Sequence, residues 1–154
     1  MAGKIDARLT ELGITLPDAP APAANYVPFV RTGDLVFVSG QISQGPDGLI
    51  KGRLGADLDV AAGAAAARRC GLSLIAQVRA ACDGDLDRVV RVIKLSGFVC
   101  STDSFADQPK VINGCSDLMV EVFGDVGRHA RAAVSTNALP LGVAVEIEAI
   151  FQVR

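Results

Sequence analysis

The residues best suited to chemistry lie in the C-terminal stretch, residues 128–154. Two carboxylates, Glu146 and Glu148, interrupt an otherwise apolar run, and Arg131 precedes them on another strand-like segment. Charged groups are rarely buried unless they are paired. The two carboxylates must therefore face water, a partner subunit or a cation, and Arg131 is the nearest candidate cation in sequence. A solvated sheet face is an equal alternative at this point.

The same stretch has the pattern of two β-strands joined by a turn at residues 138–142. Side chains alternate between the two faces of a strand. One face of the second strand is therefore expected to meet the core through Val143, Val145, Ile147 and Ala149. The other face is expected to carry Ala144, Glu146, Glu148 and Ile150. We interpret the stretch as a hairpin whose charged face needs cover.

The first residues of the chain are predicted to form an appendage to the main domain. Apolar residues at helical spacing predict a short amphipathic helix over residues 4–12. Three prolines then break regular structure and predict an extended connector. We therefore divide the chain into residues 1–24, a helix with a Pro-rich connector, and residues 25–154, a single domain with a substantial core.

The main domain is predicted to begin with a hairpin. β-rich runs over residues 26–31 and 35–41 flank a turn that contains Gly33, and a further strand is expected over residues 89–99.

Two helices are predicted between the strands. The first is expected to start at a cap, Asp57 or Asp59, and to end near Cys82, and the second to cover residues 108–124. The first helix contains two glycines, Gly63 and Gly71. Each is expected to lower the stability of that helix by about 1 kcal/mol relative to alanine. Tight packing is the expected compensation. This order favours an α+β two-layer fold, with a mainly antiparallel sheet and two helices on one face.

Composition excludes several classes of protein. The net charge of −2 and the pI near 5.3 argue against a chain that binds nucleic acid mainly by charge. The four cysteines show no paired spacing and there is one histidine, so neither a zinc site nor another metal site is expected. No apolar run is long enough to span a membrane. We expect a cytoplasmic protein with reduced thiols.

Three stretches together carry a resemblance to a known family. They read NYVPFVRTGDLVFVSGQIS, DLDRVVRVIKLSGFVCSTDSFA and RAAVSTNALPLGVAVEIEAI, and they span the chain from about Tyr26 to Val153. In their order and spacing they resemble the RidA/YjgF family of imine deaminases, also called endoribonuclease L-PSP proteins. The resemblance implies a chorismate-mutase-like fold, assembled as a homotrimer around a central β-barrel, with active sites between subunits. The N-terminal helix and connector resemble an addition found in one branch of the family.

The resemblance assigns roles to particular residues. Arg131 stands nine residues before Pro140, as the substrate-binding arginine of the family does, and its guanidinium can hold a carboxylate through two hydrogen bonds. Glu146 matches the glutamate that orients the hydrolytic water, and Tyr26 matches a pocket tyrosine. Ser39 and Gly40 match a segment that lines the cleft. An internal ion pair of Arg131 with Glu146 or Glu148 is the structural alternative.

Two further residues belong to the implied site, and a histidine lies close to it in sequence. Asn113 lies near the family's pocket asparagine, with a register that is off by one residue. Ala133 stands where many members carry a cysteine, so a thiol is absent from that position. His129 is two residues from Arg131 and can share its face, although a solvated or interface histidine is the favoured interpretation.

The function that the resemblance implies is hydrolysis of small 2-imino or enamine acids, such as 2-aminoacrylate and 2-iminopropanoate, to 2-keto acids and ammonia. The implied ligand is thus a small 2-imino or 2-keto acid, and no cofactor is required. Two alternatives stay open. One is an endoribonuclease, which the mild acidity disfavours. The other is a trimer that binds small carboxylates, or acts as a chaperone, without turnover.

Overall fold

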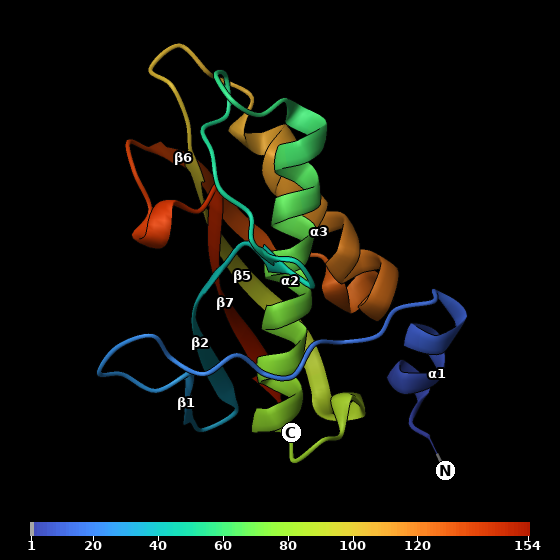
Figure 1. Ribbon diagram of the computed structural model, residues 1–154. Helices are drawn as coiled ribbons and strands as arrows, with labels where there is room; N and C mark the ends of the chain where they lie inside the picture. Colours follow the sequence, from blue (N-terminus) through green and yellow to red (C-terminus); the bar gives the residue numbers. More distant parts are fainter. Residues whose placement is uncertain (1) are drawn as a thin grey trace.

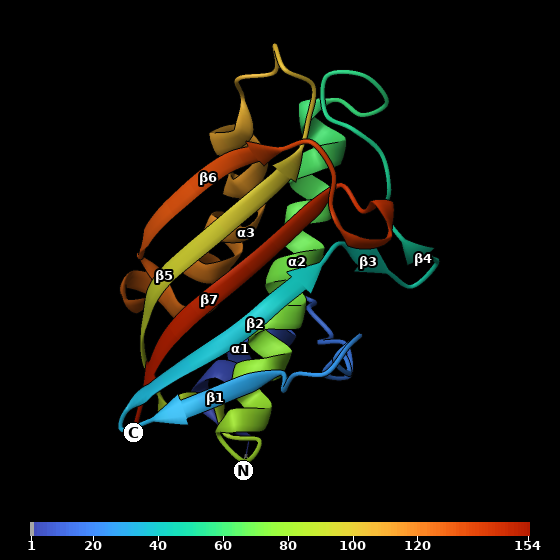
Figure 2. The same ribbon diagram turned by 90° about the vertical axis from the view of Figure 1, so that its left-hand side faces the viewer.

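The protein is built around one five-stranded sheet with two long helices on a single face (Figure 1; Figure 2). The computed structural model describes residues 2–154. The sheet has the order β1-β2-β7-β5-β6 and consists of β1 (Phe29–Thr32), β2 (Leu35–Ile42), β5 (Val89–Cys100), β6 (Ala130–Thr136) and β7 (Val145–Val153). The helices on its covered face are α2 (Val60–Ala81) and α3 (Gln108–Phe123). The predicted α+β two-layer fold is confirmed.

Shorter elements connect these parts. A small two-stranded sheet follows β2, a short helix begins the chain, and three 3₁₀ turns join longer elements. They are β3 (Gln44–Gly45), β4 (Gly48–Leu49), α1 (Lys4–Glu11), η1 (Leu86–Arg88), η2 (Gly124–Gly127) and η3 (Pro140–Gly142).

The predicted hairpin between the last two strands is wrong. β5 lies between β6 and β7, pairing parallel with β6 and antiparallel with β7. Local sequence patterns cannot reveal this arrangement, because β5 comes from a much earlier part of the chain than β6 and β7. The strand alternation in β7 is correct from residue 145 onward. Val143 and Ala144 precede β7, and both are fully buried, so the expected exposure of Ala144 is also wrong.

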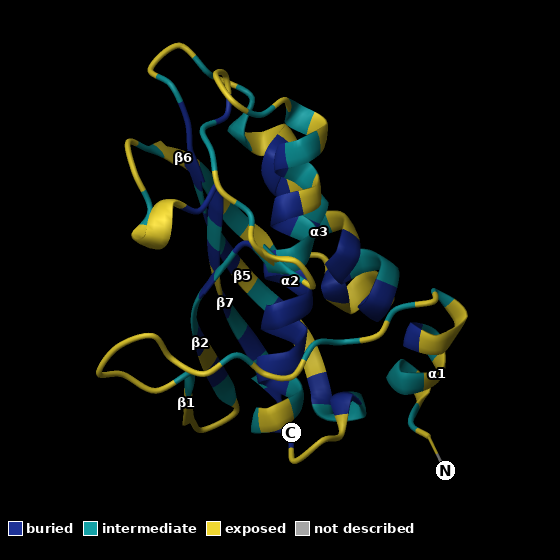
Figure 3. Cartoon of the chain, viewed as in Figure 1, coloured by how far each residue is buried: buried dark blue, intermediate teal, exposed yellow. Residues whose placement is uncertain are grey.

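The long helix α2 packs closely against its neighbours because small residues make up much of its buried face. The carboxylate of Asp59 caps α2 by accepting a hydrogen bond from the backbone N–H of Ala62, at 2.8 Å. A Cβ added at Gly63 would come within 2.7 Å of Leu54, and one added at Gly71 within 2.8 Å of Leu118. The expected compensation for both helix glycines, tight packing, is confirmed. Figure 3 shows the buried section of α2, which includes every residue from 70 to 78.

A third glycine sets how closely the two helices approach. A Cβ at Gly114 of α3 would overlap the backbone carbonyl of Ala64 on α2. A flexible side chain could rotate away from such an overlap, but a helix backbone cannot. The separation of α2 and α3 therefore depends on the absence of a side chain at Gly114.

Replacing Gly114 with alanine is expected to lower the free energy of unfolding by about 1–3 kcal/mol, the usual cost of overpacking a core. Urea denaturation would measure the change. Gly45→Ala is the matched control, because its added Cβ would meet only Arg69 Nε, at 3.8 Å. Equal effects of the two substitutions would contradict the packing argument.

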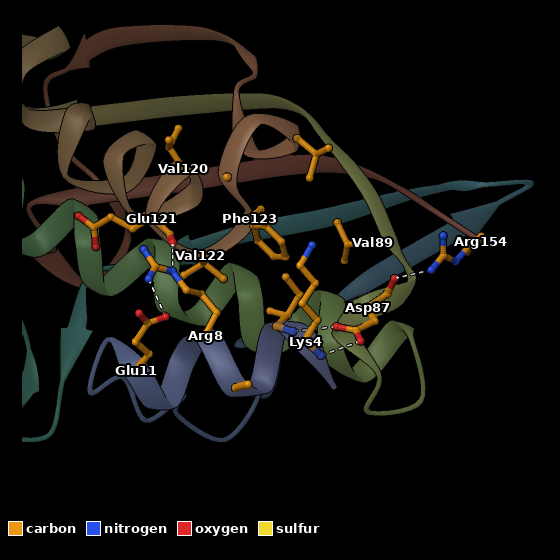
Figure 4. A pocket seen from close by; sticks show the side chains of 14 residues that line it. Lys4, Arg8, Glu11, Asp87, Val89, Val120, Glu121, Val122, Phe123 and Arg154 are labelled. Carbon is orange, nitrogen blue, oxygen red and sulfur yellow. Dashed lines mark hydrogen bonds and ion pairs between the residues drawn. The ribbon is translucent and has the colours of Figure 1, made fainter. Parts of the chain in front are cut away.

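The predicted N-terminal helix is present, and a carboxylate from another element caps it. Its own cap position, Gly3, has no side chain to offer. Instead Asp87 accepts hydrogen bonds from the backbone N–H groups of Lys4 and Ile5, each at 2.8 Å (Figure 4). The hydrogen bonds from Ile5 and Lys4 hold the pKa of the Asp87 carboxyl below its ordinary value. Arg8 adds a hydrogen bond to the carbonyl of Glu121 on α3, at 2.9 Å.

The docking of α1 is expected to depend on pH. Because the folded pKa of Asp87 is depressed, its contribution is present above the unfolded value, near 4, and is lost as the pH falls through the folded value. Asp87→Asn is expected to speed amide hydrogen exchange in residues 4–12 at pH 7. Asp47→Asn, in the exposed turn between β3 and β4, is the control. Unchanged exchange in the Asp87 variant would contradict this capping role.

All four cysteines are free thiols with buried side chains. Within residues 2–154, no helix combines the length and apolar character that crossing a membrane requires.

Candidate active site

Three of the predicted site residues line one cleft, which we call the glutamate cleft. Tyr26, Gly40 and Glu146 lie in its wall, and its volume is about 510 Å³. Residues 20–24 form another wall, and Pro140 and Leu141 of η3 form part of its rim. Tyr26 precedes β1, which begins three residues later than predicted, at Phe29. The tyrosine therefore stands on a bend beside the cleft, and its hydroxyl accepts a hydrogen bond from the N–H of Ala23 at 3.3 Å.

A β-bulge in β2 creates room for the carboxylate. The register of β2 against β7 shifts between Val38 and Gln41, and Gly40 lies inside this shift. A Cβ at Gly40 would overlap Oε1 of Glu146. The glycine thus lets the carboxylate lie directly against the backbone of β2, and any other residue there would displace it.

The surroundings of Glu146 make its carboxyl a weaker acid than that of an ordinary surface glutamate. Burial raises the pKa of the Glu146 carboxyl above its ordinary value, and the nearby charge of Glu148 raises it further. A carboxylate with a raised pKa is a better proton acceptor than an ordinary surface glutamate, provided that it is ionised. Glu148 is exposed and lines a neighbouring groove together with Ser39. The Ser39 hydroxyl donates to the carbonyl of Val27 at 2.7 Å, and Ser39 is not among the residues that line the glutamate cleft.

The remaining predicted residues gather around Arg131, in what we call the arginine cluster. The Nη1 atom of Arg131 donates to Oδ1 of Asn113 at 2.8 Å and to Oγ of Ser116 at 3.1 Å. Its Nη2 atom donates to the carbonyl of Pro109 at 3.2 Å. These three partners come from α3, which packs against β6. Asn113 therefore lies next to Arg131, and its assignment to the substrate pocket stays a prediction.

The guanidinium of Arg131 is held by neutral groups alone. In the described part of the chain, the ion pairs do not include Arg131, and the alternative of an internal pair with Glu146 or Glu148 is not formed. Neutral acceptors fix the orientation of the side chain and leave its positive charge uncompensated. Such a group suits an anionic ligand. Ala133 lies on the same face of β6, two residues further on, and packs against the core.

His129 orients the serine that holds Arg131. Its Nδ1 lies 2.7 Å from the carbonyl of Gly127, and its Nε2 lies 2.8 Å from the Ser116 hydroxyl. A carbonyl can only accept, so Nδ1 carries the proton, and Nε2 accepts from Ser116. Burial lowers the pKa of His129; the hydrogen bond to Gly127 opposes this, and Arg131 lowers the pKa further. The histidine is a neutral support for the arginine cluster.

Stability is expected to fall below neutral pH because of His129. Its folded pKa lies below the unfolded value near 6.5, so its contribution is fully present above about pH 6.5 and is lost as the pH falls through the folded value. The free energy of unfolding, measured in urea at pH 7.5 and pH 5, is expected to fall more in the wild type than in His129→Gln. Equal losses would contradict the role of His129 as a neutral residue.

The structure places the two groups on opposite faces of the sheet. Arg131 pairs with Leu95, a core residue that faces the helices, whereas Glu146 pairs with Phe98 and faces away from them. β5 lies between their strands, so about 10 Å of sheet separates them as well. One chain therefore does not bring Arg131 and Glu146 into a single site. The prediction that they lie on adjacent strands is wrong.

Sequence reasoning missed Gln41, Gln77 and Ser116. The bulge at Gly40 turns Gln41 toward the core, where its amide donates to the carbonyl of Ser39 at 2.9 Å. Gln77 on α2 is 1% exposed. A glycine inside a strand is a recognised sign of a bulge, and it could have revealed the inward turn of Gln41. No local pattern marks Ser116, whose role depends on the strand that packs against α3.

Comparison with known proteins identifies the family. The model of the family described as "YjgF/chorismate_mutase-like, putative endoribonuclease" matches residues 6–151. Protein TCP17 of Trypanosoma cruzi is 51% identical over 155 residues, covering 99% of this chain and 96% of TCP17. The crystal structure of Atu1372, a protein of unknown function from Agrobacterium tumefaciens, is 48% identical with a TM-score of 0.90, covering 97% and 92% of the two chains.

A less similar crystal structure is that of a protein named RidA. RidA from an Antarctic Psychrobacter species is 26% identical with a TM-score of 0.60, and the match covers 88% of this chain and 94% of that one. The chain belongs to the YjgF/RidA family, and its fold is of the YjgF/chorismate-mutase-like type. The family model begins inside α1, and the division of the chain at residue 24 stays a prediction.

Proposed function

We propose that the protein hydrolyses small 2-imino acids, or the enamines that tautomerise to them, to 2-keto acids and ammonia. One observation carries the proposal: neutral partners hold the Arg131 guanidinium, and within the described residues no ion pair compensates its charge. That charge suits the carboxylate of an imino acid. The glutamate cleft supplies the second requirement, a carboxylate that can place and deprotonate a water molecule.

The chemistry needs two positioned groups. Arg131 pairs with the substrate carboxylate and so orients the C=N bond. Glu146 accepts a proton from water as the water oxygen bonds to the imine carbon, and the imine nitrogen takes up a proton. The resulting carbinolamine loses ammonia when its C–N bond breaks, and the hydroxyl oxygen becomes the carbonyl of the keto acid. No oxidation occurs, because water supplies the oxygen.

The two groups are proposed to meet between two copies of the chain. Their placement on opposite faces of the sheet supports this arrangement, since Arg131 and Glu146 of one chain are separated by β5. The uncovered face of the sheet also carries exposed apolar side chains, including Val30, Phe37 and Val134, which are 54%, 43% and 46% exposed. Such a face favours association. A closed homotrimer, as in the implied family arrangement, would bury it.

Two single variants test the assignment. Glu146→Gln is expected to lower kcat for imine hydrolysis by about 10²–10⁴-fold, the usual contribution of a positioned base. Arg131→Ala is expected to raise KM and to weaken the binding of pyruvate. In the wild type, kcat/KM should fall as the pH drops through the raised pKa of Glu146. The assay measures ammonia released from freshly generated 2-iminopropanoate.

Mixing the two variants tests whether the site is shared. If Arg131 and Glu146 of different subunits form each site, co-refolded chains of the two variants should regain activity at about a quarter of the sites in a closed ring. Each variant refolded alone is the control. Wild-type rates in either single variant would contradict the mechanism, and no recovery on mixing would contradict the shared site. Cleavage of RNA with unchanged kinetics in both variants would point to a separate nuclease activity.

A further inference from the structure

We propose that the connector, residues 20–24, is the specificity-determining wall of the glutamate cleft, held in place by Gln77, and that it selects substrates with an uncharged, apolar side chain. This inference rests on the proposed function, because it concerns the side chain of the same imino acid. It adds a role for a segment that contains none of the groups assigned to the chemistry.

The connector presents an entirely apolar surface to the cleft. Its five lining residues are Pro20, Ala21, Pro22, Ala23 and Ala24. The side of the cleft formed by β2, β4 and η3 is also largely apolar and includes Ile42, Leu49, Pro140 and Leu141. Small alanines leave space between these walls, and prolines restrict the backbone that carries them. The cleft therefore has room for an aliphatic or thioether side chain and offers it apolar contacts.

A buried amide ties the connector to the body of the protein. The Nε2 atom of Gln77 donates to the carbonyl of Pro20 at 2.7 Å, and it lies 3.4 Å from Oε1 of Gln41. Gln77 is 1% exposed and Gln41 is 6% exposed. In the part of the chain that the structure describes, Oε1 of Gln77 is buried without a partner. A leucine would avoid that unfavourable burial, so packing alone does not explain an amide at this position.

The contacts that hold the connector continue through Gln41 to the carboxylate of Glu146. Gln41 donates to the carbonyl of Ser39 at 2.9 Å, within the bulge that contains Gly40. Gly40 in turn lies against Glu146. The connector, α2 and the bulge thus form one continuous set of contacts, and Figure 1 shows the connector crossing α2 on its way to β1. Gln77 is a positioning residue, because it acts through the connector and Gln41.

The charge of the cleft lining strengthens the preference for substrates with an uncharged side chain. Within the described residues, the lining of the cleft contains one carboxylate, Glu146, and neither lysine, arginine nor histidine. An acidic side chain on the substrate would meet apolar walls and a like charge, and both disfavour it. A neutral apolar side chain meets neither obstacle. The substrate class is therefore an imino acid with an aliphatic or thioether side chain, in preference to a dicarboxylic one.

Placing a cation in the wall tests the inference. Wild type is expected to prefer 2-imino-4-methylpentanoate over 2-iminoglutarate by about tenfold or more in kcat/KM. Ala21→Arg should reduce this preference at least about tenfold, mainly through KM. The matched control is Ala19→Arg, which places the same cation two residues earlier, outside the lining of the cleft. Both positions are exposed, so both variants should fold.

A second variant tests the hydrogen bond between Gln77 and the connector. Gln77→Leu should raise KM for the apolar substrate about tenfold and lower kcat by a smaller factor, because a loosened connector must be ordered again on binding. Hydrogen exchange of the Ala23 amide, which donates to the Tyr26 hydroxyl, should speed up. An unchanged KM with unchanged exchange would overturn the role of Gln77.

The outcomes separate this inference from the proposed function. If wild type releases no ammonia from any imine, the proposed function fails. The specificity role of the connector is then tested by calorimetric binding of 4-methyl-2-oxopentanoate and 2-oxoglutarate. A shift of the binding preference in Ala21→Arg alone would support the wall without catalysis. An unchanged preference in Ala21→Arg, an equal shift in Ala19→Arg, or binding of neither keto acid would overturn the inference.

Discussion

The pairing of β5 with β7 is the constraint on which the other features depend. These two strands form the middle of the sheet, and β2 and β6 join their outer edges. Because β5 separates β6 from β7, Arg131 cannot reach Glu146 within a chain, and it turns instead toward neutral partners on α3. The uncompensated charge of Arg131 is thus a consequence of strand order. It is also the property that the proposed chemistry uses.

Glycine permits the close contacts that shape both parts of the candidate site. Gly114 lets α3 lie against α2, and α3 then presents Asn113 and Ser116 to Arg131. Gly40 lets the Glu146 carboxylate lie against β2, in an environment where burial raises the pKa of Glu146. Both glycines are needed because a neighbouring group occupies the place of a side chain. Glycines therefore determine both how the helices pack and how the Glu146 carboxylate is placed.

Much of the fold could be predicted because its determinants are local. The cap at Asp59, the proline in the first turn of α3 and the alternation from Val145 onward all depend on neighbours in sequence. The predictions that were wrong concern features that a local sequence pattern does not determine. The hairpin between β6 and β7 was the simplest local solution, and the insertion of β5 is a long-range event. Tyr26 was assigned to a strand that begins only at Phe29, beyond the prolines that keep the connector irregular.

The sequence by itself determined which elements form, which side of β7 is apolar, and which residues resemble a family site. Short-range patterns suffice for these, because backbone preference and side-chain alternation act over a few residues. Only the tertiary structure decided which strand lies beside which, that Asp87 caps α1, and that Gln77 holds the connector over the cleft. The contacts of Asp87 with α1 and of Gln77 with the connector join residues more than fifty positions apart. Such contacts depend on how whole elements pack, and no local pattern encodes their partners.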